Sequence, residues 1–208
     1  MRNECASYGA EASQPVAEVK ELYGSVRNAP FCPQHDLVVW PQHLAPKGDA
    51  SNGVVHESFL DWWSRCKYAL ANLDSMICEQ WVHRHWFCSP HRYIKLEELG
   101  WRSEIWSASE FLENVGSSTD DGLRDRSQLA EYYDPKTHQP HQSAQALEKG
   151  SWDFPPIVLG TPHGFVDQYK RRISLPYLLI EGHLRYGCLK ALVDQGHKFK
   201  SQRVFVIT

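Results

Sequence analysis

The chain has 208 residues, of which 42% are hydrophobic and 23% are charged, and it carries a formal net charge of −3 at pH 7. This composition is typical of a soluble globular protein of one domain and argues against wholesale disorder. The sequence contains no run of 18 apolar residues and no apolar segment near its start, so we expect neither a membrane span nor a signal peptide. Its six cysteines lack the spacing of a disulfide framework, which favours reduced thiols in a cytoplasmic protein.

The C-terminal quarter is basic, although the whole chain is slightly acidic. Residues 164–208 contain eight basic and three acidic residues, a net charge of +5, which leaves −8 for residues 1–163. The overall negative charge argues against bulk coating of nucleic acid. The local excess favours an anionic ligand, most simply phosphate, or else a solvated basic face.

Two N-terminal regions precede the main domain. Residues 1–55 are rich in Pro, Gly, Ser and Asn, and we expect an irregular arm in which the apolar run Leu37–Trp40 could be a short strand. Residues 56–91 form a helical extension, because apolar residues at three- and four-residue spacing predict one helix over 57–87. Its tryptophans are most simply core residues.

The third region, residues 92–208, mixes strand and helix signals. The alternating segment Tyr93–Leu96 could be a strand, and Ser107 with Glu110 predicts a capping box that starts a short helix. After a polar loop over 116–143, the pattern predicts a helix at 144–149, a strand at 155–160, a hairpin over 163–175, a strand at 177–180, a helix at 184–193 and a strand at 203–208. This order indicates a mixed α/β or α+β domain.

The strongest candidate for a functional site is the segment of residues 177–196, YLLIEGHLRYGCLKALVDQG. In this segment an apolar strand is followed by Glu181, a glycine and then a helix. Glycine lets the backbone approach a ligand closely, and the first amides of a helix form a site for anions. Arg185 on the first turn could add a bidentate contact to phosphate. We therefore predict a phosphate site formed by Gly182, His183, Leu184, Arg185 and Tyr186. The alternative is a glycine turn that binds no ligand.

These residues resemble the ParB N-terminal/sulfiredoxin-like superfamily. Its members share a strand, a turn and helix of the form G-x-x-R-x-x-A, and a closing strand; here the turn runs from Gly182 to Cys188, and RVFVI follows. The resemblance covers about residues 92–208 and is most specific around 177–196. It implies an α+β fold in which helices flank a mixed sheet, with a nucleotide or other phosphate bound on the turn.

The sequence departs from the best-known members of that superfamily. Sulfiredoxin-like members place a reactive cysteine after the glycine of the turn, where this chain has His183, so we do not expect sulfinic acid repair. Partition proteins carry two consecutive arginines and continue into a helix-turn-helix domain. Only Arg185 is present here and the sequence stops after the last strand, so we expect a stand-alone domain without a CTP-operated clamp.

Free-serine kinases and proposed nucleases of the superfamily use related G-H-x-R turns. The resemblance therefore implies ATP or CTP with Mg²⁺, used by a kinase or NTPase. A kinase needs a carboxylate that accepts the proton of the substrate hydroxyl. Glu104 is the candidate for this role by analogy, and Glu181 could bind the metal; an ordinary surface carboxylate is the simpler interpretation of each.

Two other classes of function stay open. A DNA-binding or nicking protein of mobile-element or phage-defence type would hold a DNA phosphate on the same turn, with Lys170, Arg171 and Arg172 as further contacts. A non-catalytic interaction protein would instead present indole side chains to a partner protein. The candidates for such a surface are Trp62, Trp63, Trp101 and Trp106.

A second constellation is independent of the turn. Cys32 and His35 form one Cys-x2-His pair, Cys88 and His91 form another, and a phenylalanine precedes each pair. Two such pairs supply the four nitrogen and sulfur ligands of tetrahedral Zn²⁺. The pattern predicts a structural zinc that ties the N-terminal arm to the domain, with chance pairing among eleven histidines as the alternative.

Overall fold

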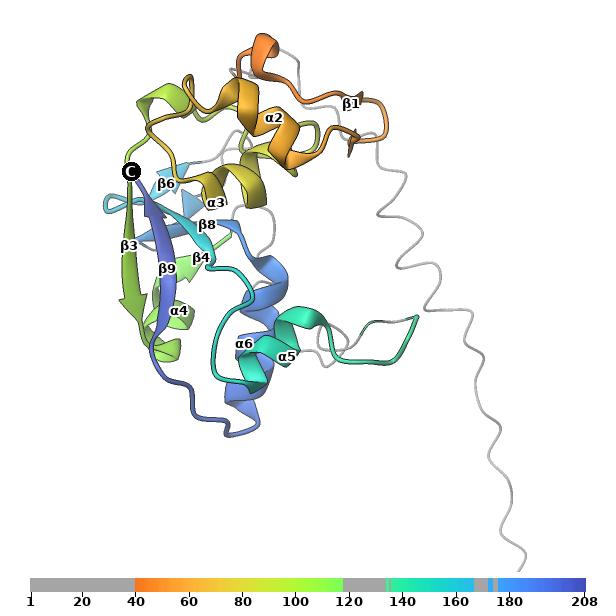
Figure 1. Ribbon diagram of the computed structural model, residues 1–208. Coiled ribbons are helices and arrows are strands. Elements are labelled where there is room, and N and C mark those ends of the chain that lie inside the picture. Colours follow the sequence, from red (N-terminus) through yellow and green to blue (C-terminus); the bar gives the residue numbers. More distant parts are fainter. Residues whose placement is uncertain (1–39, 118–133, 135, 167–171, 174–175) are drawn as a thin grey trace, which may run out of the picture. The chain divides into compact units, whose positions relative to one another are not determined.

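The computed structural model describes residues 40–117, 134, 136–166, 172–173 and 176–208. The described residues belong to one compact unit, and Figure 1 labels most of its α-helices and strands. They form five α-helices, a five-stranded mixed sheet and two short hairpins, which confirms the α+β class. Within this part of the chain, no helix has both the length and the hydropathy that a membrane crossing requires.

The central sheet has the strand order β3-β9-β5-β8-β4. Its strands are β3 (Trp101–Trp106), β4 (Val115–Gly116), β5 (Ile157–Gly160), β8 (Tyr177–Glu181) and β9 (Gln202–Ile207). The strand β5 pairs in parallel with β9 and antiparallel with β8. At the edges, β3 runs antiparallel to β9 and β4 runs parallel to β8, so two strands at the β8 edge end in the same direction.

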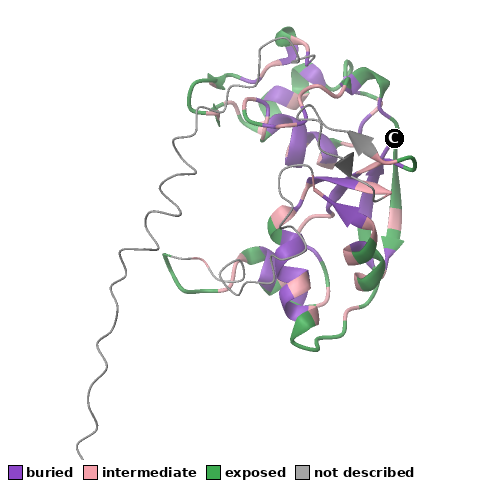
Figure 2. Ribbon diagram, turned by 180° about the vertical axis from the view of Figure 1, so that it is seen from behind, coloured by how far each residue is buried: buried purple, intermediate pink, exposed green. Residues whose placement is uncertain are grey.

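Both faces of this sheet are buried. Along β9, Phe205 and Ile207 enter one hydrophobic cluster, while Val204 and Val206 enter the other. Successive side chains of a strand point to opposite faces, so each cluster covers one face. Burial on both faces explains why the central strands read as continuous apolar runs rather than as an alternation. Figure 2 shows these strands as largely buried between two layers.

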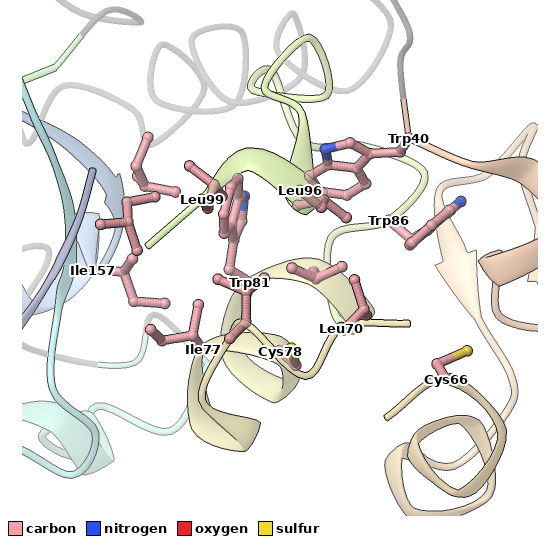
Figure 3. Packing of buried hydrophobic residues seen from close by; sticks show 14 of the residues in the cluster. Trp40, Cys66, Leu70, Ile77, Cys78, Trp81, Trp86, Leu96, Leu99 and Ile157 are labelled. Carbon is pink, nitrogen blue, oxygen red and sulfur yellow. The ribbon is translucent and has the colours of Figure 1, made fainter. Parts of the chain in front are cut away.

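The first layer is built by the N-terminal part of the described chain. Its elements are η2 (Gln42–Leu44), the hairpin of β1 (Gly48–Asp49) and β2 (Val54–Val55), α2 (Phe59–Cys66), α3 (Ser75–Ile77), the π-helix η3 (Cys78–His83) and η4 (Leu96–Glu98). Trp40 lies 5.5 Å from Trp81 and 5.2 Å from Trp86 between ring centroids. Together with aliphatic side chains that include Ile157 of the sheet, these buried indoles fill the layer (Figure 3), so the assignment of the helical tryptophans to the core is confirmed.

The prediction of one continuous helix over 57–87 is wrong. The helix α2 ends after Cys66, and the chain turns before α3 begins at Ser75. The side-chain amide of Asn72 donates hydrogen bonds to the carbonyls of Leu96 and Leu99, at 2.7 and 2.8 Å. The Asp74 carboxylate then caps α3 by accepting a hydrogen bond from the backbone amide of Met76. These hydrogen bonds stabilise the break between α2 and α3, because Asn72 binds the segment around Leu96 and Leu99 and Asp74 caps the start of a new helix.

The expected strand at Tyr93–Leu96 is also displaced. That segment forms turns and the start of η4, and the strand lies instead at Trp101–Trp106, paired with β9 over its whole length. As an edge strand, β3 has a largely exposed surface; Ile105 on it is 63% exposed. Its sequence therefore lacks the apolar alternation that would identify it.

The second layer covers the opposite face with α4 (Ala108–Asn114), α5 (Gln142–Glu148) and α6 (His183–Asp194). The capping box of α4 is confirmed: the Glu110 amide donates to the Ser107 hydroxyl at 3.1 Å, and the Ser107 amide donates back to the Glu110 carboxylate. The helices, strands and hairpin predicted after residue 143 are present within a few residues of their expected bounds, whereas most of the possible strand at Leu37–Trp40 and most of the polar loop over 116–143 lie outside the described residues. The elements that are present include the hairpin of β6 (Phe165–Val166) and β7 (Arg172–Ile173).

We expect Asn72→Ala to lower the free energy of unfolding by about 2 kcal/mol, because two partly buried carbonyls lose their donor. Urea denaturation measures the change. Asn114→Ala is the matched control, since Asn114 donates one bond to an exposed helical carbonyl at the end of α4. Equal losses for the two variants would contradict a structural role for Asn72 in breaking the helix.

Candidate functional site

The strand β8 passes into the helix α6 through a single residue. Gly182 has a φ of 113°, a conformation that side chains with a Cβ atom rarely adopt. A Cβ atom there would also lie 3.1 Å from the Cβ atom of Pro156. Conformation and space both require glycine, so the twelve-residue helix starts directly at the end of a buried strand, as Figure 1 shows.

The start of α6 lies beside the end of a second, parallel strand. His183 follows β8 and Ser117 follows β4, and the two strands are paired in parallel. The hydroxyl of Ser117 is 3.3 Å from Nε2 of His183. Ligands of open α/β sheets bind outside the carboxyl ends of parallel strands. The turn therefore stands at the edge where such ligands are found, with two polar side chains brought together.

Arg185, the residue predicted to contact phosphate, is engaged with two carboxylates of the protein. Its side chain is buried, with Nε 2.7 Å from Oδ1 of Asp153 and Nη1 3.6 Å from Oε1 of Glu181. The Asp153 carboxylate also accepts from the Ser143 hydroxyl and from the Phe154 amide. Burial alone would raise the pKa of Asp153, but its contacts with Arg185 outweigh burial and lower that pKa below its usual value.

On its other side, Glu181 contacts a histidine of the first layer. Nε2 of His85 is 3.2 Å from Oε2 of Glu181, and this contact is an ion pair when the imidazole is protonated. Burial alone would lower the pKa of His85, but contacts with the Cys88 sulfur and with Glu181 raise it to about 9. Burial likewise would raise the pKa of Glu181, and His85 is the main partner that instead lowers it.

Four groups thus form a chain of alternating charge: His85, Glu181, Arg185 and Asp153, hereafter the charge chain. They come from the first layer, the end of β8, the start of α6 and the loop before β5. At neutral pH the two positive and two negative groups balance. The network therefore adds no net negative charge beside the amides at the start of α6.

The other predicted residues of the turn differ in accessibility. Leu184 is 37% exposed, whereas Tyr186 is buried and its hydroxyl donates to the carbonyl of Leu112 at 3.2 Å. Tyr186 therefore belongs to the core of the second layer. Cys188 is buried in the same layer, as a small packed thiol would be.

The structure does not bring Glu104 to the turn. Glu104 lies on the edge strand β3, where it accepts a hydrogen bond from the Trp106 indole at 2.6 Å and pairs with Arg102. Three strand spacings separate β3 from β8, roughly 14 Å at about 4.8 Å per spacing. A ligand on the turn would have to span that distance to use Glu104 as a base.

Half of the predicted zinc site can be placed. Cys88 is exposed, with its sulfur 3.7 Å from Nδ1 of His85, and His91 is buried with Nδ1 3.4 Å from the Tyr93 hydroxyl. Cys32 and His35 lie outside the described residues. Within the described ranges, no three His, Cys, Asp or Glu side chains are grouped so that they could hold a metal. The four-ligand zinc site therefore stays a prediction.

The residues of the two alternative functions are placed unevenly. Lys170 and Arg171, the proposed DNA contacts, lie outside the described residues, and the side chain of Arg172 is not described. Of the four indoles proposed as a partner surface, Trp62 and Trp106 are buried, Trp63 is partly buried and packs against the core, and Trp101 is 39% exposed. The indoles of Trp62 and Trp106 are thus too buried to contact a partner protein.

His85 and Asp153 are the members of the charge chain that the sequence did not identify. Nothing in the local sequence distinguishes Asp153, which precedes β5 by four residues and is 32 residues from Arg185. His85 is three residues before Cys88, a spacing that places both side chains on one helical turn.

The chain was also compared with protein-family models, curated proteins and solved structures, and none of the three comparisons found a match.

We expect Arg185→Ala to lower the free energy of unfolding by about 3 kcal/mol, because it leaves the Asp153 carboxylate buried without its ion-pair partner. Lys190→Ala on the same helix is the control, since it breaks a more exposed pair with Asp194 and should cost no more than about 0.5 kcal/mol. Denaturant unfolding of both variants measures the difference. Similar losses in the two variants would show that the Arg185 contact is not a structural one.

The raised pKa of His85 predicts a pH dependence of stability. Because the pKa is about 9 in the folded protein against about 6.5 when unfolded, the stabilisation is fully present below pH 6.5 and is lost as pH rises through 9. Glu181 stays ionised across this range, since its pKa is lowered. Urea unfolding of wild type and His85→Gln from pH 6 to 10 should show a gap that closes with pH. A gap independent of pH would contradict the charge on His85.

Proposed function

We propose that the chain is a ParB/sulfiredoxin-like domain whose turn at Gly182–Arg185 binds the phosphate of a nucleotide or of another phosphorylated small molecule. The observation that carries the proposal is the glycine turn itself. It starts a twelve-residue helix at the end of a buried strand, and the glycine at the N-cap position has no side chain that could cap the helix. The first amides of a helix have no acceptor within the helix and attract anions.

The neighbouring side chains support an anion at this point. His183 and Ser117 are 3.3 Å apart beside the helix start, and each can donate a hydrogen bond to a phosphate oxygen. The charge of Glu181, the nearest carboxylate along the chain, is offset by His85 and Arg185. A phosphate on the amides would therefore meet donors and no uncompensated negative charge.

Arg185 has a positioning role in this proposal. Its guanidinium holds Asp153, and so ties the loop before β5 to the first turn of α6. That contact fixes the position of the amides instead of adding a direct phosphate ligand.

The carboxylates do not fit a magnesium site in this arrangement. The two oxygens of Glu181 contact His85 and Arg185, and the two oxygens of Asp153 accept from Arg185, Ser143 and the Phe154 amide. Mg²⁺ needs carboxylate oxygens that are available to it. We therefore propose phosphate binding without a metal held by the protein, and we derive no phosphoryl transfer step.

Thermal denaturation with ATP, CTP or inorganic phosphate, each with and without Mg²⁺, tests the proposal. A ligand at 100 times its dissociation constant stabilises the folded protein by about 2.7 kcal/mol, which raises the melting temperature visibly. His183→Ala should weaken binding at least tenfold, because a hydrogen bond to a charged group contributes about 1.5–3 kcal/mol. The exposed His163 gives a matched control, His163→Ala, which should bind as wild type does.

Two results would overturn phosphate binding at the turn. One is the absence of any shift with all three probes at millimolar concentration. The other is a shift that His183→Ala and His163→Ala leave equally unchanged, which would place the ligand elsewhere.

A further inference from the structure

Three side chains that the phosphate proposal does not need as ligands stand in a row: Cys88, His85 and Glu181. The sulfur of Cys88 is 3.7 Å from Nδ1 of His85, and the other ring nitrogen, Nε2, is 3.2 Å from Oε2 of Glu181. A nucleophile beside a base that a third group orients is the arrangement of covalent catalysis with Ser or Cys. Here the three roles fall on a thiol, an imidazole and a carboxylate.

The fold holds the row in place from two sides. His85 and Cys88 share one tight turn, in which the Cys88 amide donates to the His85 carbonyl at 3.0 Å. Glu181 comes from the end of β8, 96 residues away along the sequence. Gly53, with a φ of 67°, passes so close that a Cβ atom there would be 3.4 Å from the Cβ atom of Cys88. The thiol therefore stands at a defined place, with a glycine loop beside it.

Cys88 differs from the other described cysteines. Cys66, Cys78 and Cys188 are buried in the two cores. Burial raises the pKa of the Cys66 thiol and raises that of Cys78 to about 12, so both stay protonated. Cys88 is the exposed thiol of the described set, and it has a histidine within reach of its sulfur. Reactive cysteines are accessible thiols beside a positive charge.

We propose that Cys88 is a nucleophilic cysteine that takes acyl groups, with His85 as the residue that donates a proton to the leaving group and accepts one from water, and Glu181 as the residue that positions His85. In the first step the Cys88 thiol gives its proton to solvent, and the thiolate beside the protonated His85 forms a bond to the carbonyl carbon of an activated ester. The bond from that carbon to the leaving group breaks, and the leaving group takes the proton from His85. The product is a thioester on Cys88.

Water completes the cycle in the second step. His85 accepts a proton from water as the water oxygen bonds to the thioester carbon, and the carbon–sulfur bond breaks. The thiolate leaves and again lies beside the protonated His85, and the acyl group departs as a carboxylic acid. No metal, oxidant or reductant is required. The proposal is independent of phosphate binding, because its readouts are chemical changes on the Cys88 sulfur.

The zinc prediction and this proposal exclude each other at Cys88. A thiolate bound to zinc in a structural site is not free to attack a carbonyl carbon. A zinc-bound Cys88 would be shielded from alkylation, and a chelator would release it. A chelator arm therefore belongs in the test.

The first experiment measures alkylation of Cys88 by iodoacetamide, followed peptide by peptide with mass spectrometry in the full-length chain. A thiol with an ordinary pKa of about 8.5 is less than about 1% thiolate at pH 6. We expect wild-type Cys88 at pH 6 to react at least about tenfold faster than N-acetylcysteine. His85→Gln should remove this advantage, and His163→Gln, at an exposed histidine, should keep it.

The role of Glu181 is tested by the pH profile of the same reaction. Glu181→Gln keeps the size of the side chain but removes the charge that stabilises the imidazolium. As the pH is lowered, the alkylation rate of Glu181→Gln should then begin to fall at a higher pH than that of wild type. Glu181→Asp should restore part of the wild-type profile. Circular dichroism confirms that each variant is folded; the comparison of wild type with N-acetylcysteine needs no variant at all.

The second experiment uses p-nitrophenyl acetate as the acyl donor. Wild type should release one equivalent of nitrophenolate in a burst and gain one acetyl group on the Cys88 peptide, and Cys88→Ser should do neither. Three results would overturn the proposal: a wild-type alkylation rate equal to that of N-acetylcysteine, a rate that a chelator increases, or no acetyl group on Cys88.

Discussion

The interaction on which the functional part of this molecule depends is the charge chain at the end of β8. Glu181 lies between two cations, and each of them belongs to a different layer of the fold. His85 belongs to the tryptophan-rich layer and Arg185 to the helical layer, so the ion pairs connect both layers to one strand end. Removing any one charge leaves a largely buried neighbour without its partner. This lowers the free energy of unfolding more than replacing both members of the pair by apolar side chains would.

This arrangement changes the role of the turn's arginine. A sequence motif of glycine and arginine at a helix start points to a phosphate ligand, but here the guanidinium is used inside the protein. The anion-attracting element that remains is the set of main-chain amides, with His183 and Ser117 beside it. Glu181 is part of both candidate sites, because it contacts Arg185 next to the glycine turn and His85 next to Cys88. The phosphate proposal and the cysteine proposal therefore share one structural support but no reacting atom.

Local signals made most of the fold predictable. The capping box at Ser107, the hairpin before β8 and the glycine that precedes α6 each act over a few residues, and all three are present. The failures came from contacts distant in sequence: Asn72 breaks a helix by binding carbonyls 24 and 27 residues away. For the same reason the site was predicted only in part. The turn could be read from residues 181–185, but its partners His85 and Asp153 come from segments whose position only the folded chain determines.

The measurement that most directly tests the charge chain is the NMR titration of the His85 imidazole, followed through its side-chain nitrogen shifts in wild type and in Glu181→Gln. We expect His85 to stay protonated at neutral pH and to titrate near pH 9, and we expect the Glu181→Gln substitution to lower this pKa. A His85 that titrates at or below about 6.5, the value of a free imidazole, would contradict the account, because Glu181 would then have no cation on that side.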